Sequence, residues 1–160
     1  GPRTLEDLAA RLVEGGERFF SDDEVDFLTE FRDVWPDAHL SLPVRRNVLL
    51  IGLEAMHNVT RHSGARRVVL RLAPRGRWWE LEVQDDGIGL PATALEEEDA
   101  GLGLASMRRR AEEIGAQIEW GAPPAGGTKV MLRFALRGGS RQGWFRRSHE
   151  YAGPSGRRDR

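Results

Sequence analysis

The chain has 160 residues, no cysteine and a formal net charge of -1 at pH 7. This length suits one domain with a core and tails, and the balanced charge gives no electrostatic argument for a nucleic-acid partner. The lack of cysteine excludes disulfides and thiolate metal sites. No apolar run approaches about 18 residues, which excludes a transmembrane helix and a signal peptide within this sequence.

The sequence begins with Gly1-Pro2 where a natural start would have Met. This dipeptide is typical of the remnant of a cleaved tag, so we expect an excised fragment. Cysteine-free composition suits a reducing compartment. We therefore expect a cytoplasmic domain, from a parent protein that can be membrane-bound.

Residues 1–40 predict a helix and a strand that lead into the domain. Thr4 is a suitable N-cap for a helix from Thr4 to Gly15, and Gly15-Gly16 is a typical stop signal. Apolar and polar side chains then alternate over Val25–Phe31, which predicts a strand.

A long helix from Ser41 to Ser63-Gly64 is the most informative element, with Ser41 as its N-cap. At about 100° per residue, polar side chains gather within an arc of about 60°. These side chains are Asn47, Glu54, Asn58 and Arg61, with His62 at the edge. The opposite arc carries Val48, Leu49, Gly52, Met56 and Val59. The polar arc is either an ordinary solvated face or the wall of a cleft.

The remaining elements predict one domain and a tail. First come strands Arg67–Ala73 and Trp78–Gln84, joined by a turn at Pro74–Arg77, and then an acidic segment at Leu90–Ala100 that is either a mobile loop or a solvated short helix. The segment Gly101–Leu104 leads into a helix that runs through Ile114. Strands Gln117–Trp120 and Thr128–Leu136 follow, and the chain ends in a basic, disordered tail at 137–160. Strands joined by short turns are antiparallel. We therefore expect an α+β fold, a two-layer α/β sandwich whose mixed, mostly antiparallel sheet has its helices on one face.

Glycine pairs mark three boundaries between these elements. Gly87 and Gly89 follow a strand, Gly101 and Gly103 precede a helix, and Gly126-Gly127 with Thr128 precedes the last strand. Glycine lets the backbone approach a ligand closely. A glycine-rich loop that enters a helix presents free N–H groups, which suit phosphate.

Four polar side chains could perform chemistry on a nucleotide. Asp85, at a strand end, can accept a hydrogen bond from an exocyclic amine such as that of adenine, or it is simply an Asx-turn residue. Asn58 offers an oxygen to magnesium when phosphates supply most other ligands. Glu54 can orient a water or take a proton nearby, and Arg61 can pair with phosphate oxygens.

The motifs EAMHN-x-x-RH, DDGIG, GLGLASMRRRAEEIGA and GGTKV, taken in order, resemble the ATP-binding domain of sensor histidine kinases. They are most similar to the subfamily that includes the nitrate and membrane-fluidity sensors. The short acidic loop also fits that subfamily, because only eleven residues separate Gly89 from Gly101. The resemblance covers residues 41–136 and implies the Bergerat fold of the GHKL ATPases, with ATP and Mg²⁺ as cofactors.

The resemblance also implies individual roles. Asn58 would hold Mg²⁺ and Glu54 would be the catalytic partner beside it. Asp85 would bind the adenine amine. The remaining nucleotide contacts would come from Arg61, His62, Gly87, Gly89, Gly101, Gly103, Leu104 and Thr128.

The phosphoacceptor histidine of such kinases lies in a separate dimerising hairpin, and none of the histidines here has that context. His149-Glu150 echoes an acceptor dipeptide but has no flanking helix pattern. The resemblance thus implies a monomeric fragment that presents ATP to the hairpin of a homodimeric parent, with a response regulator downstream. Two alternatives remain: a stand-alone serine kinase of the anti-sigma-factor type, and a nucleotide-binding regulatory module without transfer activity.

Overall fold

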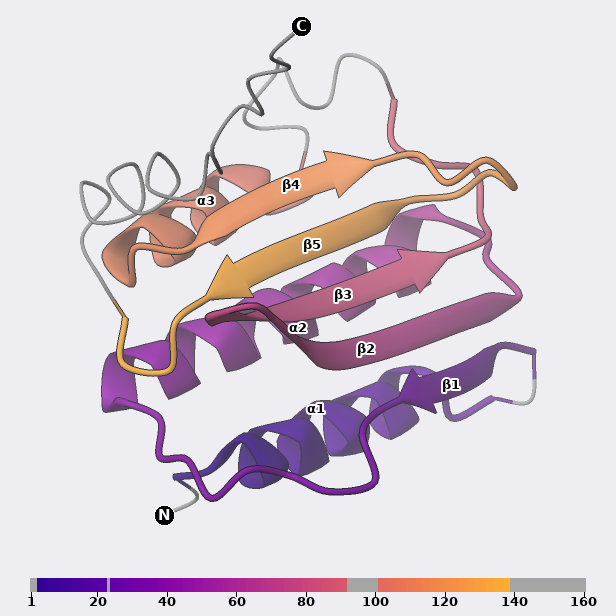
Figure 1. Ribbon diagram of the computed structural model, residues 1–160. Helices are drawn as coiled ribbons and strands as arrows, with labels where there is room; N and C mark the ends of the chain where they lie inside the picture. Colours follow the sequence, from indigo (N-terminus) through magenta and orange to yellow (C-terminus); the bar gives the residue numbers. More distant parts are fainter. Residues whose placement is uncertain (1–2, 23, 92–100, 139–160) are drawn as a thin grey trace, which may run out of the picture.

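The computed structural model describes residues 3–22, 24–91 and 101–138. Within these ranges the chain forms three helices and five strands in one sheet (Figure 1). In chain order they are α1 (Leu5–Phe19), β1 (Asp26–Glu30), α2 (Leu42–His62), β2 (Arg67–Arg75), β3 (Trp78–Asp85), α3 (Leu104–Glu113), β4 (Gln117–Gly121) and β5 (Lys129–Phe134). The predicted acidic loop lies outside the described residues except for Leu90 and Pro91, as does the predicted tail beyond 138.

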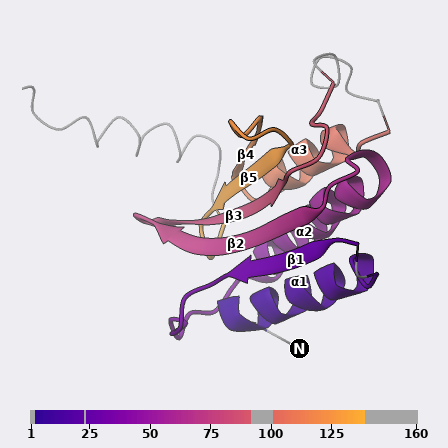
Figure 2. The same ribbon diagram turned by 90° about the vertical axis from the view of Figure 1, so that its right-hand side faces the viewer.

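The sheet has the strand order β1-β2-β3-β5-β4. β1 runs parallel to β2, and every other neighbouring pair is antiparallel. All three helices cover the same face, as the edge-on view shows (Figure 2). The predicted two-layer α+β sandwich with a mixed, mostly antiparallel sheet is therefore confirmed. No helix in the described ranges is both long enough and apolar enough to cross a membrane.

The core lies between the sheet and the helices because each element supplies one apolar side. On β2 the inward residues Val68, Leu70 and Leu72 are fully buried, and they alternate with outward residues. On α2 the buried face carries mainly aliphatic side chains, including Val44, Val48, Ile51, Ala55, Met56 and Val59. This burial of apolar area holds α2 across the middle of the sheet, where its polar edge can meet the strand ends.

The predicted end of the first helix is wrong. Thr4 caps α1 through a capping box with Asp7, as the sequence indicated, but the helix continues through Gly15 and Gly16 to Phe19. Both glycines are buried. A Cβ on Gly15 would come within 2.3 Å of the Leu53 side chain, and one on Gly16 within 2.2 Å of the Phe27 ring. These glycines therefore permit close packing of α1 against α2 and β1 and do not stop the helix.

The other boundaries shift by a few residues. β2 and β3 extend beyond their predicted ends, so the turn between them contains only Gly76 and Arg77, with Gly76 at φ +64°. The last strand is shorter than predicted and excludes Thr128. Ser41 caps α2 as expected, with its Oγ accepting a hydrogen bond from the Val44 N–H at 3.4 Å.

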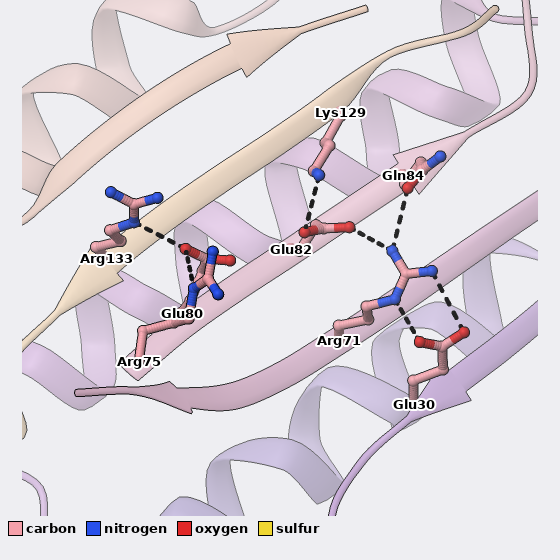
Figure 3. A network of polar contacts seen from close by, with 8 residues as sticks. All are labelled: Glu30, Arg71, Arg75, Glu80, Glu82, Gln84, Lys129 and Arg133. Carbon is pink, nitrogen blue, oxygen red and sulfur yellow. Dashed lines mark hydrogen bonds and ion pairs between the residues drawn. The ribbon is translucent and has the colours of Figure 1, made fainter. Parts of the chain in front are cut away.

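The face of the sheet without helices carries a ladder of charged side chains (Figure 3). Two glutamates on β3 are buried there, and each lies between two cations. Glu80 pairs with Arg133 at 2.8 Å and with Arg75 at 3.6 Å, while Glu82 pairs with Arg71 and with Lys129 at 3.4 Å. Arg71 also pairs with Glu30, so one guanidinium connects β1, β2 and β3.

Candidate functional site

A cavity opens between the C-terminal half of α2 and the covered face of the sheet. Its volume is about 420 Å³, a value that includes the part of the cavity that is open to solvent. Strands β3, β4 and β5 form one wall, and the segments on either side of residues 92–100 contribute to the rim. The lining residues are Ala55, Asn58, Val59, His62, Ser63, Val83, Asp85, Gly89, Leu90, Leu102, Leu104, Trp120, Thr128 and Val130.

The structure brings many of the predicted site residues together. Those that line the cavity are Asn58, His62, Asp85, Gly89, Leu104 and Thr128, which come from segments far apart in the sequence. The other predicted residues do not line it. Among them, Glu54 and Arg61 lie on α2 next to Asn58, Gly103 lies against Glu54, and Gly87 lies against Ser63. A Cβ on Gly101 would have no neighbour within 4 Å among the described residues.

Asp85 lies at the end of β3 with only 5% of its surface exposed. Its Oδ1 accepts a hydrogen bond from the Gly87 N–H at 2.8 Å, and its own N–H donates to the Thr128 carbonyl at 2.9 Å. The Asx-turn interpretation is thus correct locally. The turn occupies only part of the acceptor capacity of the carboxylate, because an ionised Asp can accept about four hydrogen bonds. Asp85 can therefore form the turn and still accept a hydrogen bond from a ligand.

Burial raises the pKa of Asp85 above its ordinary value of 3.8, although hydrogen bonds with the Gly87 and Thr128 backbone oppose the rise. A carboxylate that is removed from water and lacks a cationic partner gains from a ligand that donates to it. No ion pair to Asp85 exists among the described residues. This environment suits a neutral donor such as an exocyclic amine.

The polar edge of α2 forms a connected set of side chains. Arg61 Nη2 lies 3.3 Å from Glu54 Oε1 and donates to Asn58 Oδ1 at 3.2 Å. Asn58 Nδ2 donates to the Leu102 carbonyl at 2.6 Å, which ties α2 to the segment before α3. The two interpretations of the polar arc are both partly right. Arg61 is exposed and does not line the cavity, whereas Asn58 lines it.

Asn47 shares the polar arc but lies apart from this set. It is 4% exposed, and its Nδ2 donates to the Pro43 carbonyl at 2.9 Å. It does not line the cavity.

Two glycines allow the backbone to close around the cavity. Gly103 caps α3 at φ +67° without a side-chain cap, and a Cβ there would lie 2.7 Å from Glu54 Oε1. Gly127 has φ +90°, and a Cβ there would lie 2.0 Å from the Asp85 carbonyl oxygen. A larger residue at either position would need both an unfavourable φ and a displaced neighbour.

Sequence reasoning missed the apolar part of the cavity and one aromatic residue. The missed lining residues are Ala55, Val59, Ser63, Val83, Leu90, Leu102, Trp120 and Val130. Val83 and Val130 are register partners, and Val130 also pairs with Trp120, so these three form a row across β3, β5 and β4. Strict alternation along the strands could have identified the valines as inward-facing, but no motif pointed to Trp120.

A family model, described as histidine kinase-, DNA gyrase B- and HSP90-like ATPase, matches residues 44–138. Among individual proteins, the chain is 33% identical over 88 residues to the nitrate/nitrite sensor protein NarX of Escherichia coli K12, a match to 55% of this chain and 14% of NarX. It is 32% identical over 108 residues to the sensor histidine kinase LnrJ of Bacillus subtilis 168, a match to 68% of this chain and 26% of LnrJ. The chain therefore spans a minor part of the length of these relatives.

Solved structures share the fold at low sequence identity. The nucleotide-free catalytic domain of histidine kinase ThkA aligns with a TM-score of 0.69 and 15% identity, covering 84% of this chain and 93% of that one. The histidine kinase domain of a blue-light activated kinase from Erythrobacter litoralis aligns with a TM-score of 0.67 and 17% identity, covering 85% of this chain and 65% of that one.

Proposed function

The chain belongs to the family of histidine kinase-, DNA gyrase B- and HSP90-like ATPases, and within that family we propose that it is the ATP-binding catalytic domain of a two-component sensor histidine kinase. Its task would be to present the γ-phosphate of ATP to a histidine on a dimerisation hairpin of the parent protein. A response regulator would then take the phosphoryl group. The match to NarX and LnrJ, both sensor proteins, supports this choice within the family.

The observation that carries the proposal is the convergence of Asp85, Thr128 and Asn58 on one cavity. Asp85 is buried, keeps acceptor capacity beyond the Asx turn and lacks a cationic partner among the described residues, so it would accept the adenine amine. Thr128 lies beside it and would contact the base. His62, Gly87 and Gly89 would contribute further contacts with the nucleotide at this end of the cavity.

The phosphates would lie toward the N-terminus of α3. Gly101 and Gly103 precede this helix, and Leu104 begins it. The absence of a side-chain cap at Gly103 leaves N–H groups of the first turn available to an anion. Arg61 would pair with phosphate oxygens and would have to leave its present contacts with Glu54 and Asn58 to do so.

The donor atoms near Asn58 fit Mg²⁺. Asn58 Oδ1 and Glu54 Oε1 converge on one cationic group, the Arg61 guanidinium, and both are oxygen donors of the kind Mg²⁺ prefers. In the described ranges no cluster of three or more histidine or acidic residues could hold a metal alone. This fits an ion that takes most of its ligands from phosphates. When bound, Mg²⁺ would neutralise charge on the transferring phosphoryl group.

Glu54 would orient the acceptor or take a proton beside Asn58. The protein would otherwise contribute by positioning the reactants, because phosphoryl transfer requires little covalent chemistry from the protein. The cavity holds the base at one end, and α2 carries Glu54, Asn58 and Arg61 at successive turns toward the phosphates. The alternative of a serine kinase of the anti-sigma-factor type has no specific observation in its favour.

The test is a transfer assay with the chain and an isolated acceptor hairpin from a NarX-like kinase, supplied with labelled Mg-ATP. Phosphohistidine should form on the hairpin with the wild-type chain and should be lost with Asn58→Ala. Thr60→Ala is the matched control, because Thr60 is exposed on α2 and its hydroxyl donates to the His57 carbonyl, at 2.7 Å. Equal phosphohistidine with wild type and Asn58→Ala would contradict the proposal.

A further inference from the structure

The indole of Trp120 is a feature of the cavity that the proposed roles leave unused. Trp120 lies on β4 and lines the cavity together with Asp85 and Thr128. Its Nε1 is buried and has no hydrogen-bond partner in the part of the chain that the structure describes. A buried donor without an acceptor is destabilising, so most such groups in folded proteins have a partner.

In the described part of the chain, the apolar side chains that line the cavity beside Trp120 offer no acceptor. Val130 is its register partner on β5, Val83 lies next in the row, and Ala55 and Val59 face them from α2. The Arg108 guanidinium lies over the ring, 5.1 Å from its centroid. A guanidinium only donates hydrogen bonds, so it can hold the ring in place but cannot satisfy Nε1.

We propose that Trp120 is a specificity-determining residue that donates a hydrogen bond from Nε1 to a ring nitrogen of the adenine base. The inference rests on the proposed nucleotide-binding function and adds a residue to it. Asp85 accepts from the exocyclic amine, and Trp120 supplies the complementary donor. Adenine carries one exocyclic donor together with ring-nitrogen acceptors. Guanine carries a carbonyl oxygen in place of that amine, which cannot donate to Asp85.

The complementary pair explains why the two groups are both buried. Within the described residues, a buried, ionised Asp85 without a cationic partner and a Trp120 N–H without an acceptor are each unfavourable in an empty cavity. One planar ligand with a donor and an acceptor on its edge satisfies both. An apolar ligand would satisfy neither, and a site that leaves polar groups unpaired discriminates strongly against such ligands.

The experiment compares wild type and Trp120→Phe by calorimetry with ATP and with its 1-deaza, 3-deaza and 7-deaza analogues. Phenylalanine keeps an aromatic ring but removes the N–H. ATP should bind the variant roughly five- to tenfold more weakly, as for the loss of one hydrogen bond. For one deaza analogue, the one that lacks the accepting nitrogen, wild type and variant should bind equally.

Trp79→Phe is the matched control. Trp79 is a buried tryptophan that packs on Trp35, and it lies near the start of β3, whereas Asp85 lies at the end of that strand. This variant should bind ATP like wild type. An equal loss with ATP and all three analogues would mean that only ring size matters, and that result would overturn the proposal. No loss with ATP would overturn it as well. If the wild-type chain itself fails to bind ATP, that result contradicts the proposed nucleotide-binding function. A failure of the Trp120 hydrogen bond is therefore distinguishable from a failure of the proposed function.

A second measurement does not depend on the variant. In nitrogen-15 spectra of wild type, the Trp120 indole N–H should shift downfield when ATP binds, as expected when a donor gains an acceptor. The shift should be absent with the one critical deaza analogue. An indole resonance that moves equally with every analogue, or with none, contradicts the hydrogen bond.

Discussion

At the scale of single residues, Asp85 combines a structural task with a predicted binding task. Its Oδ1 closes the turn with Gly87, and the carboxylate keeps acceptor capacity for a ligand. Replacement by asparagine keeps an oxygen for the turn but removes the charge that would accept from the adenine amine. We expect Asp85→Asn to weaken ATP binding by roughly ten- to a hundredfold, as for the loss of a charged hydrogen bond. Calorimetry with ATP measures this, and unchanged affinity would contradict the adenine assignment.

The raised pKa of Asp85 predicts how binding depends on pH. Because burial raises this pKa above 3.8 in the folded chain, the folded state binds the proton more tightly than the unfolded state. The contribution of Asp85 to stability is therefore largest at low pH and is lost as pH rises from 3.8 through the raised value. Binding has the opposite trend, since ATP needs the ionised form. ATP affinity should fall as pH decreases through the raised pKa, and Asp85→Asn should remove this fall.

For Asn58 the prediction concerns the dependence of ATP affinity on Mg²⁺, because the Asn58 amide has two partners. Asn58→Ala removes both the bond to the Leu102 carbonyl and the oxygen now contacted by Arg61. If Asn58 holds Mg²⁺, the ratio of ATP affinities with and without Mg²⁺ should fall toward one in the variant. If it only fixes the Leu102 segment, both affinities should fall together and their ratio should persist. Paired titrations with Mg²⁺ and with a chelator separate these outcomes.

At the scale of elements, the close packing of α1 depends on its two glycines. Glycine inside a helix normally destabilises it by about 0.5–1 kcal/mol relative to alanine, so an exposed glycine there would gain stability on replacement. Gly16→Ala should instead lose about 1–3 kcal/mol, the typical cost of overpacking, since the new Cβ would meet the Phe27 ring. Chemical denaturation measures the loss. Gly121→Ala, where no neighbour lies within 4 Å of the new Cβ, is the control and should be nearly neutral.

The same glycines show where sequence reasoning succeeds and where it fails. The periodicity of α2 and the alternation in β2 and β3 predicted these elements because one side of each is buried. Gly15-Gly16 resembles a stop signal in the sequence because the contacts that require these glycines, with Leu53 and Phe27, are not local. In the candidate site, the polar residues and glycines could be predicted because they occur within recognisable sequence motifs. Trp120 and the valines beside it belong to none, because their role depends on strand register.

At the scale of the whole molecule, α2 connects the core to the cavity. Its buried face packs on the sheet, and its polar edge carries Glu54, Asn58 and Arg61. The helix therefore fixes the distance between the strand end at Asp85 and the segment before α3. Asn58 adds a direct link to that segment through Leu102. A change in the conformation of residues 101–103 would therefore affect α2 through this hydrogen bond. A ligand that competes for the Asn58 amide would break the same hydrogen bond and release the Leu102 segment.

The charged ladder on the open face of the sheet gives the last prediction (Figure 3). Arg71 pairs with Glu30 on β1 and with Glu82 on β3, and it donates to Gln84 at 3.1 Å. Glu82 has only 9% of its side chain exposed, so it depends on its cations. Arg71→Met should lose about 1–3 kcal/mol, the cost of leaving a buried charged group short of a partner. Arg75→Met is the control and should change stability little, because the Arg75 side chain is 64% exposed and Glu80 keeps Arg133.

The stability lost in Arg71→Met should also be confined to one part of the sheet. Arg71 joins β1 to β3 by ion pairs with Glu30 and Glu82, so its removal should weaken β1 more than the rest of the sheet. Hydrogen exchange should show faster exchange of β1 amides in Arg71→Met, with β5 amides nearly as protected as in wild type. A uniform loss of protection over the sheet would mean that Arg71 stabilises the domain as a whole. Wild-type protection of β1 would mean that its backbone pairing and the packing of Phe27 on α1 suffice without the ion pairs.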